Sequence, residues 1–105
     1  MKQLPVYLLE SALNDIDEIA EYVARTSSSL EVALDFTARI ERRCMKIGNA
    51  PYGGVARDDL HEGIRMVPFE SSAVILYRVA DRTIEIVNVF YGGRDYDAIM
   101  RDSNE

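Results

Sequence analysis

The chain is poor in several residue types that mark particular protein classes. It has no tryptophan, one cysteine, one histidine and three prolines among 105 residues. A lone cysteine excludes an internal disulfide, and Cys44 lies on the apolar side of a predicted helix, which indicates a buried core residue rather than a nucleophile. No apolar run approaches the roughly 20 residues of a membrane span, and no signal peptide is visible. We therefore expect a cytoplasmic protein with no membrane contact.

Common catalytic and ligand-binding motifs are also absent. The sequence contains no HExxH, no GxSxG, no glycine-rich phosphate loop and no cysteine pair for zinc. We therefore expect neither a metal nor a cofactor. His61, the only histidine, lies in an acidic turn, where an exposed turn residue is favoured over a general acid or base.

The charge balance is acidic but uneven. The formal net charge is −6 and the sequence pI is about 4.7, which argues against direct binding to nucleic acid. Residues 1–31 are strongly acidic. By contrast, four basic residues against Glu41 form a local basic patch on a second predicted helix: Arg39, Arg42, Arg43 and Lys46.

Two helices are predicted in the first half of the chain, after a short strand at Val6–Leu9. The first helix begins with Ser11 as its N-cap and ends near the turn-forming run at 26–29. The second begins after Ser28 or Ser29 and ends at Gly48. Each has a seam of apolar or small residues at helical spacing, so we expect an antiparallel hairpin.

Three strands are predicted in the second half, at Ile64–Phe69, Ala73–Val79 and Thr83–Tyr91. Pro68 cannot donate a ladder hydrogen bond, which places an edge or a bulge at that point. A short helix is expected at 95–102. The order β-α-α-β-β-β-(α) predicts one α+β domain over residues 1–105: a small antiparallel sheet with the helical hairpin packed on it.

Two arginines near strand ends are candidate functional residues. Arg65 opens the first of the three strands, and Arg94 follows the last one, with Tyr91 and Tyr96 beside it. Two guanidinium groups at neighbouring strand ends can grip a phosphate or stabilise a transition state. The alternative is structural: Arg94 pairs with a carboxylate, and Arg65 lies flat on the open face of the sheet. The residue types leave both interpretations open.

The chain resembles the ParE/RelE toxin superfamily, and its ParE-like branch in particular. The resemblance covers nearly the whole chain and rests on the order and spacing of five segments. They are the first-helix segment at 12–22, Pro51-Tyr52-Gly53, Gly63-Ile64-Arg65, Ile75-Leu76-Tyr77-Arg78-Val79 and Val89-Phe90-Tyr91-Gly92-Gly93-Arg94-Asp95. The resemblance implies the toxin of a type II toxin–antitoxin system, of the kind that serves plasmid stabilisation.

The resemblance also implies how such a toxin acts. ParE-like toxins inhibit DNA gyrase by binding it, whereas RelE-like toxins are ribosome-dependent mRNA endonucleases. Val67, Val74 and Met100 stand where the nuclease pattern expects two basic residues and a tyrosine, which favours the gyrase-binding branch and makes enzymatic activity the less favoured interpretation. The alternatives are a RelE-like nuclease that uses Arg65 and Arg94, or a non-toxic module that binds antitoxin.

The partner implied by the resemblance is a ParD-like antitoxin, through which any contact with DNA would be made. We expect it to cover the helical hairpin and the sheet edge as an added helix or strand. The candidate contact residues are the basic patch and two residues at the sheet edge: Arg39, Arg42, Arg43, Lys46, Pro68 and Phe69.

Overall fold

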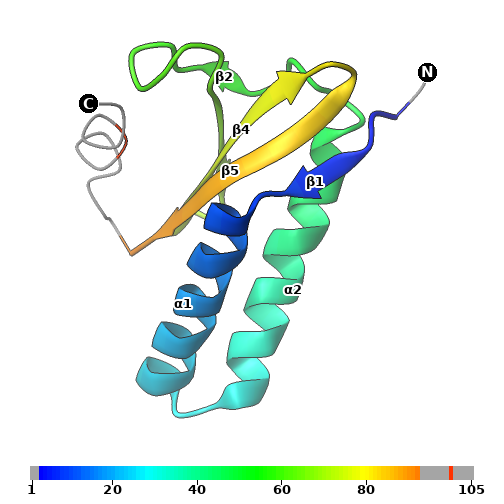
Figure 1. Cartoon of the computed structure of the whole chain (residues 1–105). Coiled ribbons are helices and arrows are strands. Elements are labelled where there is room, and N and C mark those ends of the chain that lie inside the picture. Colours follow the sequence, from blue (N-terminus) through cyan, green and yellow to red (C-terminus); the bar gives the residue numbers. More distant parts are fainter. Residues whose placement is uncertain (1–2, 93–99, 101–105) are drawn as a thin grey trace.

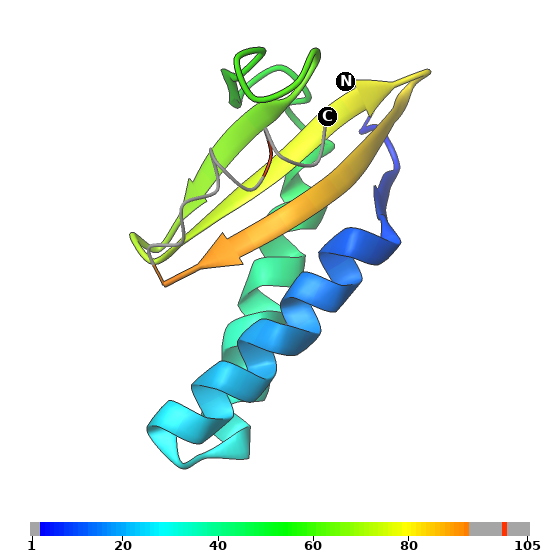
Figure 2. The ribbon, with the colours of Figure 1, turned by 60° about the vertical axis from the view of Figure 1, so that its left-hand side comes forward.

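The computed structural model describes residues 3–92 and Met100, and forms a sheet with a helical hairpin packed on one face (Figures 1 and 2). The predicted α+β fold is confirmed. Its elements in chain order are β1 (Val6–Leu8), α1 (Glu10–Ser27), α2 (Leu30–Ile47), β2 (Val55–Ala56), β3 (Arg65–Phe69), β4 (Ala73–Ala80) and β5 (Thr83–Tyr91). Apart from Met100, the predicted final helix lies outside the described residues.

The sheet has the order β1-β5-β4-β3-β2. β2 to β5 are antiparallel, as predicted, but β1 pairs with β5 in parallel, so the sheet is mixed. Parallel strands cannot be joined by a tight turn, and here the helical hairpin and β2 to β4 lie between β1 and β5 in the chain. β2 was not predicted, because two exposed residues in a loop carry no periodic signal.

Both helices are amphipathic, and their apolar stripes pack on the sheet. The predicted cap of α2 is confirmed, since Ser29 Oγ accepts from Val32 N at 3.1 Å. The predicted cap of α1 is wrong. Leu9 stands at that N-cap without a side-chain hydrogen bond, and Ser11 Oγ instead donates to Val87 O. The hydroxyl is used along the edge of β5 rather than at the helix end.

The core has two parts, one on each face of the sheet. The larger part lies between sheet and hairpin and includes Ile40, Cys44 and Tyr77, each fully buried. The confirmed burial of Cys44, with a smaller effect from Glu41, raises the pKa of its thiol to about 12, so the thiol stays protonated. The smaller part covers the other face, with these members: Leu60, Ile64, Leu76, Phe90 and Met100.

The middle strand β4 is buried on both faces at its centre. Ile75 belongs to the larger core cluster and Leu76 to the smaller one, and neither is exposed. Arg78 of this strand forms an ion pair with Glu85, at 2.6 Å. These contacts make β4 the fixed centre on which both layers pack.

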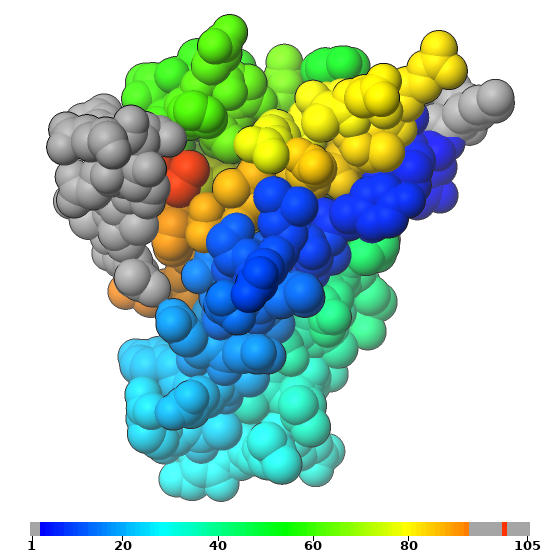
Figure 3. All heavy atoms as spheres, in the orientation of Figure 1, coloured from blue at the N-terminus to red at the C-terminus, as the bar shows by residue number. Residues whose placement is uncertain are grey.

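The hairpin extends past one end of the sheet. Its lower half, around the 28–29 turn, projects beyond the ends of β4 and β5 as a separate lobe (Figures 1 and 3). Within the described residues, no helix is long and apolar enough to cross a membrane. The projecting half leaves helix surface uncovered on the sheet side, next to Tyr91.

Candidate functional site

Arg65 lies on the helix-facing side of the sheet, not on its open face. It is the cross-strand neighbour of buried Tyr77 and alternates with Val67 and Phe69, which belong to the core under the helices. Its Nη1 donates to Tyr52 O at 3.1 Å and to Gly54 O at 2.8 Å. The prediction of an open-face position is therefore wrong.

Arg65 and Tyr77 together hold the loop at 51–54. Tyr77 Oη donates to Pro51 O and accepts from Gly54 N, each at 2.9 Å, which satisfies the hydroxyl of this buried ring. The Arg65 guanidinium also lies over the exposed Tyr52 ring, 5.1 Å from its centroid. The contacts of Arg65 are thus those of a residue that fixes a loop.

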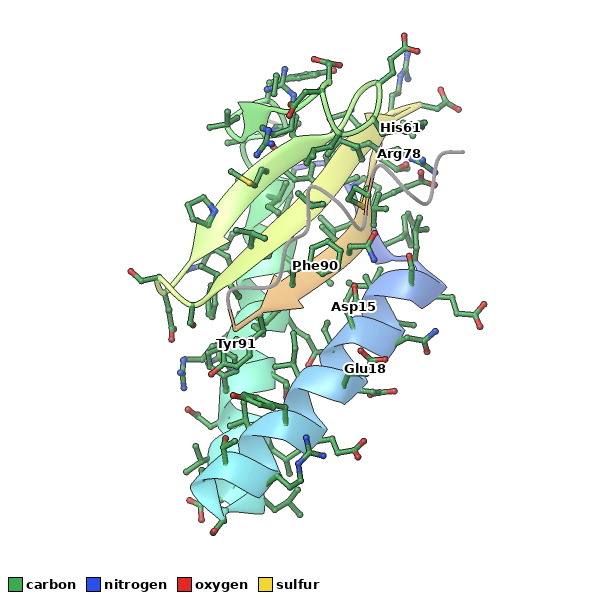
Figure 4. All side chains as sticks on the ribbon, turned by 90° about the vertical axis from the view of Figure 1, so that its left-hand side faces the viewer. Asp15, Glu18, His61, Arg78, Phe90 and Tyr91 are labelled. Carbon is green, nitrogen blue, oxygen red and sulfur yellow. The ribbon has the colours of Figure 1, made fainter. Side chains whose placement is uncertain are left out.

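Of the other members of the predicted arginine site, the structure describes only Tyr91. Arg94 and Tyr96 lie outside the described residues. Tyr91 ends β5 at the projecting part of the hairpin, whereas Arg65 begins β3 at the other end of the sheet. His61 is exposed in a bend near the same end as Arg78, away from Tyr91 (Figure 4). Arg65 and Tyr91 therefore lie at opposite ends of the sheet and do not form one site.

Tyr91 is the centre of a row of four aromatic rings. Its ring packs edge-on against Tyr22 at 5.7 Å and against Phe36 at 5.3 Å, and Phe36 lies 5.9 Å from Phe69. The row joins α1, β5, α2 and β3 where the hairpin leaves the sheet. Such rings supply large apolar contact area with little conformational freedom to lose on binding.

Two cavities open on either side of Tyr91. We call them together the aromatic groove. One has a volume of about 290 Å³ and lies between α1 and the end of β5; the described residues that line it are Asp15, Glu18, Ile19, Tyr22, Val89, Tyr91 and Gly92. The other has about 540 Å³ and lies along α2; it is lined by Val23, Ser29, Glu31, Val32, Asp35, Phe36, Arg39 and Tyr91. Volumes of this size accommodate the side chains of a bound segment.

The acidic end of the aromatic groove is positioned by the edge of β5. Asp15 Oδ2 accepts from Val89 N at 2.9 Å and from Asn88 Nδ2 at 2.8 Å. These bonds satisfy the strand edge just past a β-bulge, where β1 no longer pairs with it. Figure 4 shows Asp15 and Glu18 on α1 beside the end of β5, where Tyr91 lies.

The basic candidates on α2 fall into two groups. Arg39 lies at the aromatic groove, over the Phe36 ring at 5.4 Å. Its guanidinium pairs with Asp35 and binds both carboxylate oxygens of Glu70, at 2.9 and 3.0 Å. The hydrogen bonds between Arg39 and Glu70 lower the pKa of the Glu70 carboxyl and raise the pKa of the Arg39 guanidinium. This clasp ties the turn between β3 and β4 to α2.

Arg42 and Lys46 are exposed and form the second group. They follow Arg39 by three and seven residues and so share its face of α2, and neither pairs with a carboxylate in the described part of the chain. Arg43 follows Arg39 by one helical turn and is half-buried. The predicted patch residues therefore lie along one face of α2, where Arg39 is paired with carboxylates while Arg42 and Lys46 are exposed.

Pro68 is exposed at an open edge, as predicted. β2 pairs only with Arg65 and Met66, so β3 has no further partner at Pro68. Ile64 O accepts from Arg57 N, which places the backbone groups of the even-numbered residues on this edge. Pro68 therefore offers a carbonyl and no N–H there, which disfavours an added strand. Phe69 is buried and belongs to the aromatic row.

The nuclease positions named above hold apolar residues that take part in packing. Val67 is buried under the helices, and Val74 packs with the apolar cluster on the open face, to which Met100 belongs. No three His, Cys, Asp or Glu side chains among the described residues are placed to hold a metal ion. Of these positions, Val74 and Met100 place packing residues instead of titratable groups on the described part of the open face, and Val67 does the same on the helix-facing side.

Sequence reasoning missed Tyr22, Phe36, Asp15 and Glu18 as groove residues. Tyr22 follows Ile19 by three positions and lies on the exposed flank of a buried stripe, whereas Phe36 belongs to the buried stripe of α2. The flanking position is the signal that could have identified Tyr22. Nothing in the sequence shows that the hairpin projects past the sheet and leaves these flanks open.

These features define a small α+β protein with a groove suited to a peptide segment. A family model described as the ParE toxin of the type II toxin–antitoxin system parDE matches residues 6–96. The chain belongs to this family, and is thus a ParE-type toxin of a type II toxin–antitoxin system.

Solved structures support the same fold. A chain from the chromosomal ParDE toxin–antitoxin system of P. aeruginosa aligns with a TM-score of 0.73 and 19% identity, over 85% of this chain and 96% of that one. A chain from the toxin–antitoxin complex RelBE2 of Mycobacterium tuberculosis aligns with a TM-score of 0.60 and 15% identity, over 87% and 100%. At these identities the likeness concerns the fold alone. No curated protein matches the chain.

Proposed function

We propose that this toxin binds and inhibits DNA gyrase, and that a ParD-like antitoxin neutralises it by placing an apolar segment in the aromatic groove. The observation that carries the antitoxin proposal is the row of four rings from Tyr22 to Phe69 beside the two cavities, in which Tyr22 is exposed and Tyr91 half-buried, while Phe36 and Phe69 are buried. The family provides the general role, since its toxins are paired with antitoxins.

The groove suits a helix whose apolar residues recur on one face. Tyr22 and Val32 are about half-exposed on the walls, while Phe36 and Tyr91 form the floor. A helix laid along the groove would bury these side chains and remove apolar surface from water. Strand addition at Pro68 is less favourable, because that position lacks the N–H of a ladder.

A binding mechanism is favoured over RNA cleavage by the chemistry of the open sheet face. Cleavage at a 2′-hydroxyl needs groups that move protons, and the family positions for such groups hold Val74 and Met100 within an apolar cluster. Arg65, the predicted phosphate contact, already donates to two loop carbonyl oxygens. These residues support an inhibitor that acts by contact.

The target is tested by inducing the chain alone in a bacterial host while DNA and protein synthesis are pulse-labelled in one culture. We expect DNA synthesis to fall first, followed by inhibition of purified gyrase in a supercoiling assay. Early loss of protein synthesis would instead point to the ribosome and contradict the gyrase proposal. Growth without any effect would identify a non-toxic antitoxin-binding module.

The antitoxin proposal is tested separately, by co-producing the chain with the product of the adjacent reading frame. Tyr22→Lys places a charge on the wall of the groove and should abolish co-purification. The matched control is Tyr7→Lys, because Tyr7 is also an exposed tyrosine but lies on β1. Equal loss in both variants, or in neither, would contradict the placement in the groove.

A further inference from the structure

A second apolar surface lies on the opposite side of the hairpin. Asp15 of α1 bonds to β5, and Arg39 of α2 bonds to the β3–β4 turn, which fixes one flank of each helix toward the sheet. The helical spacing places another set of residues on the opposite flanks, along the solvent side of the helix pair. We call this set the outer seam: Leu13, Ala20, Ala24, Leu34, Ala38 and Met45.

The three long side chains of the outer seam are exposed, whereas its alanines are half-buried and Ala24 also packs against the core. Leu13, Leu34 and Met45 are 48%, 55% and 42% exposed, and the three alanines between them are half-buried. Alanines at such positions let another helix approach closely. A row of exposed apolar residues along two helices marks an interaction surface.

Two carboxylates interrupt the seam at its middle. Asp17 lies between Leu13 and Ala20, and Glu41 lies between Ala38 and Met45. Because α1 and α2 are antiparallel about the 28–29 turn, Asp17 and Glu41 stand at the same level of the hairpin. Both are exposed, and neither pairs with a cation in the described residues. Along its length, the seam therefore has an apolar end, an acidic middle and a second apolar end.

We propose that the outer seam binds a helix of a second protein in which a lysine or arginine stands between apolar residues one turn to either side. The cation would meet Asp17 and Glu41, and the apolar residues would cover the two ends of the seam. This surface is separate from the aromatic groove, so the inference goes beyond the proposed function and does not rest on it.

The two carboxylates also disfavour two other partners of the outer seam, a second copy of this chain and an anionic membrane. A two-fold pairing of two copies through their seams would bring two Asp17 and two Glu41 carboxylates to the centre of the contact, where like charges repel. An anionic membrane surface would be repelled for the same reason. A basic amphipathic helix satisfies both the apolar and the acidic parts.

The test uses the full-length protein and two synthetic helical peptides, measured by titration calorimetry. One peptide carries lysine between two leucines on one face, and the other carries glutamate in place of that lysine. We expect the lysine peptide to bind about tenfold more tightly, since the glutamate peptide exchanges attraction to Asp17 and Glu41 for repulsion. Equal binding, or no binding by either peptide, would overturn the proposal.

Variants locate the binding on the seam. Leu34→Ser should weaken the lysine peptide severalfold, whereas Val55→Ser, at an equally exposed valine on β2, should not. The double variant Asp17→Lys with Glu41→Lys should reverse the preference between the peptides. Urea midpoints would show that each variant still folds. An unchanged preference in the double variant, or concentration-dependent dimerisation that competes with the peptide, would contradict the assignment.

Discussion

The half of the hairpin under the sheet and the half that projects beyond it differ in what their side chains contact. Under the sheet, Ala12, Ile40 and Cys44 are fully buried, and Ser11 and Asp15 bond to the edge of β5. In the projecting half, Tyr22, Leu30, Val32 and Leu34 are exposed on the same two helices. We therefore expect the first half to contribute mainly to the stability of the fold, and the second to offer most of the apolar surface for the antitoxin.

This difference allows stability and binding to be tested separately. A domain of this size has little apolar surface to spare, because its core is small relative to its surface. Large side chains left in water are therefore informative when they gather in one region. The following predictions compare the two halves, beginning with the largest expected effect.

Ile40→Ala should have the largest effect on stability. Ile40 is fully buried between the helices and the sheet, and truncation leaves a cavity that the packed neighbours cannot fill. We expect the free energy of unfolding to fall by about 2–5 kcal/mol in urea titrations. Val32→Ala, in the projecting half of the same helix, should change it by about 0.5 kcal/mol or less. Equal effects would contradict the division.

Tyr77→Phe should reduce stability by about 1–3 kcal/mol, because Gly54 N–H and Pro51 O lose the hydroxyl that satisfies both. The ring itself is retained, so the change isolates the hydrogen bonds that hold the 51–54 loop. Tyr22→Phe is the matched control, since the Tyr22 side chain is about half-exposed in the projecting half. A Tyr77→Phe protein with unchanged urea midpoint would show that the loop is held by Arg65 alone.

The buried half was largely predictable from sequence. The strand at Thr83–Tyr91, the cap at Ser29 and the burial of Cys44 follow from local periodicity and turn chemistry, which the tertiary fold leaves intact. The cap at Ser11 failed for a tertiary reason, because β5 offers the hydroxyl a carbonyl of Val87 seventy-six residues away. Local patterns carry no information about such distant partners.

The candidate site was much less predictable. Arg65 and Arg94 drew attention because charge at strand ends is unusual, yet the register of β3 turns Arg65 toward the loop at 51–54. Tyr91 and Phe69 were identified for separate reasons, and only the fold shows that one aromatic row joins them. A one-residue change of register would have reversed the face of every side chain on the strand.

Val32→Ala should separate binding from stability in the projecting half. Val32 lines the aromatic groove and is half-exposed, so its truncation removes contact area for the antitoxin and little packing within the chain. We expect about fivefold weaker antitoxin binding by calorimetry, or about 1 kcal/mol, with an unchanged urea midpoint. Val55→Ala on β2 should alter neither quantity. Unchanged affinity in Val32→Ala would move the antitoxin away from this cavity.

The smallest effect should come from the clasp between Arg39 and Glu70, which lies where the two halves meet. Hydrogen bonding to Arg39 lowers the pKa of Glu70 below its ordinary value of 4.5 in the folded protein. The carboxylate therefore stabilises the fold fully above that value, and this contribution disappears as the pH falls through the lower folded pKa. Glu70→Gln should be slightly less stable than the parent near neutral pH and indistinguishable from it in strong acid. Glu41→Gln, at an exposed carboxylate of α2 outside the clasp, is the control in urea titrations across this range. If the difference between parent and Glu70→Gln grew on acidification, the ion pair would not be the source of the stability.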